Sequence, residues 1–476
     1  MKLFKRFFSA ALVVGAVALM AYFTDPAAPR AEALEADSQP GRETLHIWYT
    51  DDDLAEYIGS AALSFTEKAE NSHVRIVATQ VPALEYLERI NSAAAAGTGP
   101  DLFVMAHDQL EKAYLARLAS EVAAEAFASV RADYPQAGVN AVTYQEKILA
   151  YPLYFETSAL LYNKSHLTEM IKIKIEADAD EAAAIQAELD LAEFGPTDEI
   201  DETSTHLEEV LRLLADEDYV AGQVEDLLPE TFENLTEIAN LYGAPDGVTG
   251  ILKWDVNDIF YNYFFVGNAI TVGGETGDDS GNIDISNGAA RKALEMYQNL
   301  NQFFAIETSE VRYSAVIEEF IAGELVYTIA TTDAVARLRA ASEAGEFPYE
   351  YGVLRTPDID SETPTRPLSM VSCVAINGYS PHQAEANRFA AYLAGEFAGN
   401  LYARAGKVPV ALSATEGSEE LAVFAAEFAR SIPLPKMMVT SNFWIQLENA
   451  FARIWEGGDV GEQLRQLAAL IEGQVS

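Results

Sequence analysis

The sequence predicts an α/β fold with a parallel sheet, and three observations point to this class. From residue 43 onward, predicted strands alternate with amphipathic helices, a pattern that gives parallel strands joined by right-handed crossovers. The chain has 476 residues, a length for which two domains are expected. Hydrophobic residues make up 49% of the chain, enough to fill sizeable cores.

The first five elements alternate without interruption. Apolar runs predict strands at 44–50, 73–80 and 101–106, and apolar residues at helical spacing predict helices at 54–69 and 83–96. In sheets of this kind, ligands bind beyond the carboxyl ends of the strands. The residues that follow these strands are therefore candidates for a binding site.

Two of these strands end in consecutive polar residues. The first is followed by three aspartates at 51–53, and the third, within GTGPDLFVMAHDQL, runs into His107, Asp108 and Gln109. Both sets are expected at the ligand-binding edge. His107 beside Asp108 could serve acid–base chemistry, but a structural role at the strand end is the favoured interpretation.

An acidic insertion interrupts the α/β pattern. Between residues 176 and 226 the chain carries eighteen Asp and Glu residues and one basic residue, Arg212. Helical spacing at 181–194 and 205–220 predicts a helical hairpin, within an insertion of about 170–228, that packs one apolar face on the body. The hairpin is interpreted either as a solvated decoration or as a docking surface for a partner.

The remaining predicted elements continue the α/β pattern. Residues 148–167 are predicted to form a pair of strands with Pro152 between aromatic residues, and 253–274 a loop-rich aromatic stretch. Further strands are predicted at 325–330, 349–358 and 367–380, and helices at 229–242, 287–304, 313–324, 382–406, 441–458 and 459–473.

The N-terminus has the features of an export signal. Three basic residues within the first six precede an apolar run at 7–23, and Ala31-Glu32-Ala33 offers a cleavage site before Leu34. Residues 1–33 are therefore assigned to a signal peptide or an uncleaved anchor, and 34–42 to a linker. No cysteine follows the run, so a lipoprotein is excluded. The protein is expected to be periplasmic or extracellular.

Composition and motifs exclude several function classes. The chain has 31 Lys and Arg against 74 Asp and Glu, a net charge of −43 that would repel nucleic acid. The single cysteine, Cys373, is expected to be a small buried residue, and no Cys or His spacing is typical of zinc. No P-loop, G-x-S-x-G, H-E-x-x-H or dinucleotide motif is present. No enzyme activity, cofactor or metal is predicted.

Aromatic residues are interleaved with acids and amides in YPLYFETS, WDVNDIFYNYFF and SNFWIQLEN. Rings stack on the C–H faces of sugars, and carboxylates accept hydrogen bonds from hydroxyl groups. A cleft that contains both would suit a sugar or a small cation.

The chain resembles the family-1 extracellular solute-binding proteins of ABC importers, most closely the maltose/maltodextrin-binding type. The resemblance rests on an ordered set of landmarks that covers nearly everything after residue 43 except the acidic insertion. They are LHIWYTDDD, GTGPDLFVMAHDQL, YPLYFETSALLYNKSHL, PETFENLTEIA, FIAGELVYTIA, YGVLRTPD, VAINGYSPHQAEANRFAAYLAGE and SNFWIQLENAF.

The resemblance implies a two-lobe periplasmic-binding-protein fold of type II, with the ligand cleft between the lobes. One lobe would comprise 43–154 and 374–425, and the other 157–368 and 428–476, with the acidic insertion in the second. The chain would cross between the lobes near Phe155, Met370 and Arg430.

The resemblance also implies a set of sugar contacts. Asp52 and Asp108 match acids that accept hydroxyl groups in the first lobe, and Glu156 matches an acid of the second lobe at the hinge. The remaining matches are an acid and three rings: Asp258, Phe260, Tyr261 and Trp444.

Four positions depart from the maltodextrin-binding pattern. Met105 and Asp333 replace tryptophans of that pattern, and Gln109 and Glu448 replace arginines. The cleft is therefore expected to be poorer in rings and more anionic than in maltodextrin-binding proteins, which weakens a maltodextrin specificity.

These observations predict an exported, monomeric binding protein that captures a sugar or oligosaccharide by lobe closure and delivers it to an ABC permease in the membrane. One alternative is a binding protein for a cationic solute, such as an amino sugar or polyamine. A remote alternative is a carboxylate-based glycoside hydrolase, and another is a surface protein that uses the acidic hairpin for adhesion or docking.

Overall fold

The computed structural model describes residues 42–193, 210, 212–308 and 311–475. The predicted export signal, its cleavage site and nearly all of the linker lie outside these residues. Within them, no helix is long and apolar enough to cross a membrane.

The first lobe begins with the predicted alternation. Strands β1 (Glu43–Tyr49), β2 (Val74–Gln80) and β3 (Leu102–Ala106) pair in parallel, in the order β2-β1-β3. Helices α2 (Leu54–Glu67) and α3 (Tyr86–Ala95) connect them. The parallel sheet predicted for this region is therefore confirmed, and its carboxyl ends carry the polar residues noted above.

Strand β6 (Ala150–Asn163) is one continuous strand, so the predicted pair of strands is wrong. Pro152 is tolerated because it lies beside a bulge: Tyr154 pairs with Ser372 and Pro152 with Cys373, which leaves Leu153 extra. A proline has no N–H for the ladder, and bulges are among the few places that accept one inside a sheet.

The long β6 strand connects the two halves of the molecule. Its first half pairs antiparallel with β12 (Leu368–Ile376), which also borders β3, and its second half pairs antiparallel with β10 (Leu325–Thr331). The path ends in β7 (Gly250–Leu252), parallel to β10. Along this path the central pairings are thus antiparallel, and the outer strands keep the predicted parallel order.

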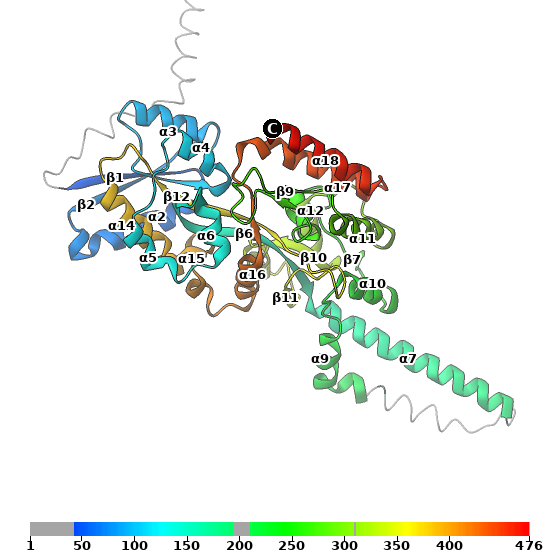
Figure 1. Ribbon diagram of the computed structural model, residues 1–476. Helices are drawn as coiled ribbons and strands as arrows, with labels where there is room; N and C mark the ends of the chain where they lie inside the picture. The colour runs from blue at the N-terminus through cyan, green and yellow to red at the C-terminus, as the bar shows by residue number, and fades with distance from the viewer. Residues whose placement is uncertain (1–41, 194–209, 211, 309–310, 476) are drawn as a thin grey trace, which may run out of the picture.

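Helices cover the sheet on both sides, and Figure 1 shows two bodies side by side joined at β6 and β12. The first body also contains α4 (Leu110–Leu115), α5 (Ala124–Arg131), α6 (Gln136–Val142), α14 (Gln383–Ala394), α15 (Leu401–Ala405) and α16 (Glu419–Arg430). The second contains α10 (Phe232–Leu241), α11 (Gly288–Phe304), α12 (Tyr313–Ile321), α13 (Asp333–Ala344), α17 (Ser441–Trp455) and α18 (Val460–Val475).

Short strands complete the sheets. They are β4 (Thr143–Tyr144), β5 (Lys147–Ile148), β8 (Thr271–Val272), β9 (Ile283–Asp284), β11 (Tyr351–Leu354), β13 (Val408–Pro409) and β14 (Ile432–Pro433). The aromatic stretch 253–274 is mostly loop and 3₁₀ turns, as predicted.

The helix predicted at 382–406 is broken into α14 and α15. Gly395 ends α14 where the backbone approaches a neighbouring helix: an added Cβ would lie 2.4 Å from Val130 Cγ1 and 2.9 Å from Ala391 O. The interruption comes from tertiary packing, which helical periodicity does not reveal.

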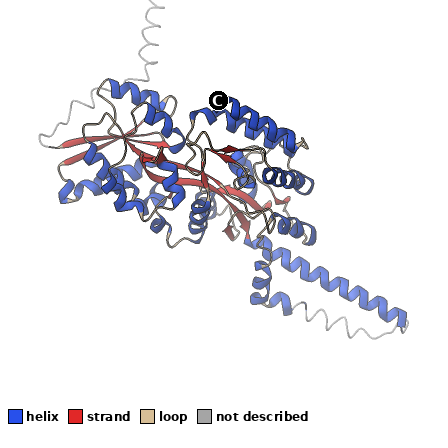
Figure 2. Ribbon diagram, viewed as in Figure 1, coloured by secondary structure: helices blue, strands red, loops and turns tan. Residues whose placement is uncertain are grey.

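The acidic insertion is helical where it is described. Helix α7 (Lys164–Glu193) extends away from the second lobe, and α9 (Glu217–Glu225) returns beside its base (Figures 1 and 2). Buried Met170, Ile171 and Val224 anchor that base. The expected packing on the body therefore holds only near the base, because the far part of α7 points away from the lobe.

Candidate functional site

A cavity of about 660 Å³ lies between the two lobes. The first lobe contributes the turn after β3, the central strands contribute Glu156 and Met370, and the second lobe contributes residues 258–261, the segment 434–440 and the start of α17. Seven of the ten predicted site residues line it: Asp108, Gln109, Glu156, Asp258, Phe260, Tyr261 and Trp444.

His107 fixes the geometry of the turn after β3. Its ring is fully buried; Nδ1 accepts a hydrogen bond from the Val371 N–H at 3.0 Å, and Nε2 donates to the Leu434 carbonyl at 2.9 Å. Burial lowers the pKa of His107 to about 3, so the ring is neutral. The ring thus links β3, β12 and the wall of the cavity, a structural role that leaves the next residue, Asp108, to line the cavity.

Asp108 lines the cavity and has one unsatisfied carboxylate oxygen. Its Oδ1 atom is buried and has no hydrogen-bond partner within the described part of the chain. Burial raises the pKa of the carboxyl group, although backbone N–H groups of residues 108 and 109 oppose the rise. A buried acceptor without a partner is costly, so Asp108 is suited to a ligand that supplies a donor.

Two further carboxylates line the cavity. Burial raises the pKa of Glu156, and Asp333 and Asp51 raise it further, whereas Lys407 lowers it. Burial also raises the pKa of Asp258, whose Oδ1 accepts the Phe260 N–H at 2.8 Å and so caps the turn that carries the rings. These carboxylates are acceptors, so a ligand must bring the donors.

The aromatic residues lie on the second-lobe side. The Tyr261 ring stacks on Tyr313 with centroids 4.5 Å apart, and Phe260 meets Tyr261 edge-on at 6.0 Å. Trp444, near the start of α17, is half-buried. Its ring lies beside the buried Tyr263 ring, with the two ring centroids 5.7 Å apart. The supporting rings hold Tyr261 and Trp444 in place, as a stacking surface requires.

Asp333 and Glu448 are not among the described residues that line the cavity, and Asp333 is exposed. Asp333 Oδ1 accepts hydrogen bonds from the hydroxyl groups of Tyr313 at 2.6 Å and Thr331 at 2.5 Å. Glu448 is partly buried, and its pKa is raised by burial and by the charge of Asp258. Both acids therefore add negative charge near the site.

Asp52 is exposed and lies outside the cavity lining. Its neighbour Asp51 lines an adjoining cavity of about 450 Å³ that shares Gln109 and Lys112 with the first. Asp51 is ion-paired with Lys407 at 3.0 Å. The sequence placed Asp51 among three candidate aspartates, but the strand end alone does not say which of them turns inward. Lys407 did not stand out in the sequence.

Sequence reasoning also missed the apolar wall of the cavity. Leu434, Pro435, Met437 and Met438 line it from an irregular segment that carries no periodic signal. Buried Lys436 holds this segment by donating to the carbonyls of Asn140, at 2.8 Å, and Thr276. Burial lowers the pKa of Lys436 to about 8.

The cavity has few positive groups. Among the described residues that line it, Lys112 is the one basic residue, and it forms an ion pair with Glu88. Among the described residues, the one group with the spacing of metal ligands lies elsewhere, as discussed below. The geometry is that of a binding cleft with acceptors, rings and an apolar wall.

The family model of bacterial extracellular solute-binding proteins matches residues 50–399. The chain belongs to this family. As a bacterial extracellular solute-binding protein it is an exported protein, and its fold is the two-lobe periplasmic-binding-protein fold with the cleft between the lobes. The resemblance inferred from the sequence landmarks is therefore confirmed.

Similar solved structures are two-lobe sugar-binding proteins. A cyclo/maltodextrin-binding protein complexed with maltotetraose has a TM-score of 0.68 and 18% identity, covering 92% of this chain and 99% of that one. An extracellular solute-binding protein from Staphylococcus aureus in complex with maltose has a TM-score of 0.67 and 19% identity. The match covers 92% of this chain and 98% of that one. At these identities the likeness establishes the fold.

One curated relative is similar over a shorter stretch. The galactooligosaccharide-binding protein of Bacillus subtilis (strain 168) is 29% identical over 141 residues, which are 30% of this chain and 32% of that protein. The matched stretch spans about a third of the relative, so its ligand does not pass to this chain by similarity alone.

Proposed function

We propose that this solute-binding protein captures a sugar or short oligosaccharide in the interlobe cleft and delivers it to an ABC permease, without covalent chemistry. The observation that carries the proposal is the combination, around one cavity, of carboxylate acceptors with supported aromatic rings. Sugars match this combination because they offer hydroxyl donors and C–H faces on the same ring.

The size of the site suits a small ligand. The main cavity of about 660 Å³ lies within the range of cavities that enclose small molecules. The adjoining cavity of about 450 Å³, reached past Gln109 and Lys112, would accommodate a longer chain.

Lobe closure is the proposed working motion. The crossings between the lobes are few, at β6, β12 and the irregular segment that begins near Ile432, and hinge motions use such short connections. We propose lobes of 43–154 with 374–425 and of 157–368 with 428–476. We further propose a monomer that is either released by signal cleavage or retained by its anchor, and that carries no lipid.

Replacing Trp444 by alanine is expected to weaken sugar binding by about 1–3 kcal/mol, since a stacking ring and its buried area are lost. Calorimetry with the best sugar from a panel of mono- and oligosaccharides measures the change. Tyr379→Ala is a matched control because that aromatic residue is 53% exposed and lies outside both cavities. Unchanged affinity in Trp444→Ala would show that the ligand lies elsewhere.

A cationic solute, such as an amino sugar or polyamine, is a second candidate. The observation that favours it is the excess of negative charge: Asp108, Glu156 and Asp258 line the cavity against Lys112. Two more acids lie close by, because the charge of Asp333 raises the pKa of Glu156 and the charge of Asp258 raises the pKa of Glu448. Like charges held close raise one another's pKa, and a cation would relieve them.

Salt dependence separates the two candidates, because screening weakens attraction between charges and leaves stacking and neutral hydrogen bonds nearly unchanged. For a neutral sugar, we expect affinity to stay the same between low and high ionic strength, and in Asp333→Asn and Glu448→Gln. Calorimetric titrations of the best ligand provide the measurement. If affinity falls with added salt and in both Asp333→Asn and Glu448→Gln, the ligand is cationic and the sugar proposal is wrong.

The absence of covalent chemistry has its own test. A glycoside hydrolase would cleave chromogenic glycosides with two carboxyl groups, and here Glu156 would be one of them. We expect no turnover by the wild-type protein; turnover that Glu156→Gln abolishes would contradict a pure binding function.

A further inference from the structure

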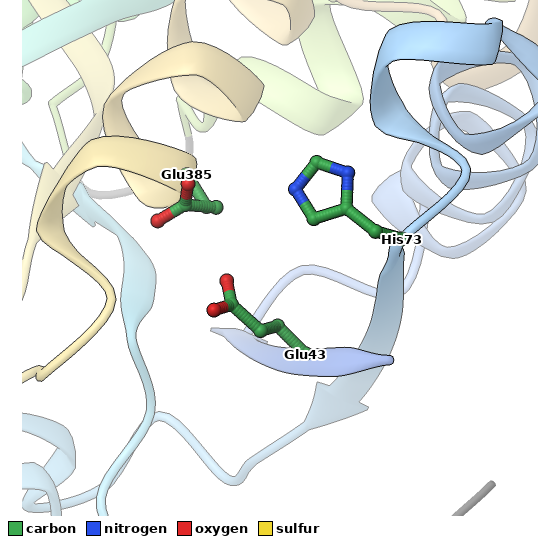
Figure 3. Close-up of side chains that lie close together, drawn as sticks. All are labelled: Glu43, His73 and Glu385. Atoms are coloured by element: carbon green, nitrogen blue, oxygen red, sulfur yellow. The ribbon is translucent and has the colours of Figure 1, made fainter. Parts of the chain in front are cut away.

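Three potential metal ligands meet on the first lobe, outside the cleft. They are Glu43, the first residue of β1, His73, directly before β2, and Glu385, in the first turn of α14. One ligand atom of each lies within 4.8 Å of the other two, and Figure 3 shows the three side chains converging on one space from separate elements. All three side chains are exposed or partly exposed, so an ion could reach them.

The backbone holds these residues in register. The Glu43 N–H donates to the His73 carbonyl at 2.9 Å, and Glu43 pairs with Val74 in the parallel ladder. Their side chains therefore start from adjacent strands at a fixed separation. A site built on strand ends needs less reordering to bind an ion than one built on a free loop.

An arginine orients the third ligand. Arg388 Nη1 donates to Asn71 Oδ1 at 3.2 Å, which ties α14 to the turn before β2, and Arg388 Nη2 lies 3.5 Å from Glu385 Oε1. Groups that hold a ligand from behind in this way are common around metal sites. Arg388 also offsets part of the repulsion between the two carboxylates.

The cluster lies at the edge of the sheet opposite to the cleft. Strands β1 and β2 begin here, whereas the carboxyl end of β1 leads into Asp51 and the cavities described above. Binding at this cluster is therefore separate from binding of a solute, and the two can be measured independently.

We propose that Glu43, His73 and Glu385 bind a zinc ion. Imidazole nitrogen favours zinc over magnesium and calcium, which prefer all-oxygen sites. Three protein ligands leave a fourth, tetrahedral position for water. The ion would join the start of β1, the start of β2 and α14, and so fasten the point where the chain enters the lobe.

Sequence spacing could not reveal this site. Its ligands come from three segments of which the last is more than three hundred residues from the first, and no pair of them has a spacing typical of zinc. Only the parallel pairing of β1 with β2 and the packing of α14 bring them together. The sequence-based expectation of no metal rested on local motifs alone.

Calorimetric titration of the metal-stripped full chain with zinc chloride tests the proposal. We expect one zinc ion per chain and a raised melting temperature, because an ion that binds only the folded state stabilises it. His73→Ala and Glu385→Gln should each weaken zinc binding at least tenfold. A saturating sugar should leave zinc affinity unchanged.

Three variants serve as controls. Glu70→Gln changes an exposed acid of the same lobe, His382→Asn changes a nearby histidine that pairs with Asp101, and Asp108→Asn changes the cleft; all three should keep wild-type zinc affinity. The proposal is overturned if the wild-type chain takes up no zinc, if His73→Ala retains full affinity, or if a hundredfold excess of magnesium or calcium displaces the ion.

Discussion

The variant His107→Ala is expected to lower the free energy of unfolding by about 3–5 kcal/mol. The substitution removes a buried ring and leaves a cavity. It also leaves the Val371 N–H and the Leu434 carbonyl without their hydrogen-bond partner. A large-to-small change in a core and the loss of a partner by a buried polar group each cost about 1–5 kcal/mol. Chemical denaturation of the full chain measures the loss.

The matched variant is His107→Gln, whose amide can both accept and donate. It should recover part of the stability that alanine loses, because one or both hydrogen bonds can be restored. Equal stability of the wild-type and alanine variants would mean that the ring does not link β3, β12 and the wall of the cavity.

Lowering the pH should reduce the stability of the fold through the same residue, His107. The folded protein keeps His107 neutral down to a pKa of about 3, whereas in the unfolded chain the ring takes up a proton near the ordinary histidine pKa of 6.5. The unfolded state therefore binds more protons between these values, so stability falls as pH is lowered through this range. In His107→Gln, this part of the pH dependence should disappear.

The variant Asp108→Ala is expected to weaken binding of the captured sugar by about 1.5–3 kcal/mol, the range for a hydrogen bond to a charged group. This corresponds to a loss of affinity of about 10- to 150-fold. The reason is that Asp108 lines the cavity and that its buried Oδ1 atom has no partner in the described chain. Calorimetry with the best sugar from the panel measures the effect.

The control for Asp108 is Asp52→Asn, which changes an exposed aspartate on the same edge of the sheet. The family resemblance assigns both acids to the sugar, but the cavity is lined by Asp108 and not by Asp52. We expect Asp52→Asn to change affinity little. A strong effect at Asp52 with none at Asp108 would show that the ligand contacts the loop after β1 instead.

Sugar affinity should also fall in mild acid. Burial raises the pKa of Asp108 and of Glu156 above their ordinary values, so both take up protons at a higher pH than exposed carboxyl groups. A protonated carboxyl group loses acceptor capacity towards sugar hydroxyl groups. Affinity that stays constant as these groups protonate would argue against carboxylate acceptors in the site.

The sequence predicted those features that local patterns encode. The alternation up to β3 gave the parallel strands and the polar edge, and the landmark order gave the family. The pattern did not predict β6 as one strand, because the bulge that admits Pro152 depends on pairing with β12. It did not predict the break after α14, because Gly395 approaches a helix distant in sequence.

The site was predictable to a similar extent. Carboxylates and rings within strong landmarks, such as Asp108 and Trp444, were brought together by the fold. Residues on irregular segments were missed: Lys407 pairs with Asp51, and Met437 and Met438 form part of the wall. Their positions depend on tertiary contacts, such as that of buried Lys436, which no local pattern records.

Small-angle X-ray scattering of the full chain with and without sugar tests the central claim, ligand capture by lobe closure, most directly. A sugar that raises the melting temperature should also reduce the radius of gyration of the wild-type protein, because a ligand held by both lobes favours their approach. Asp108→Ala should show neither change at the same sugar concentration. A radius of gyration that stays constant while a sugar is demonstrably bound, or a panel in which no sugar binds, would contradict the proposed function.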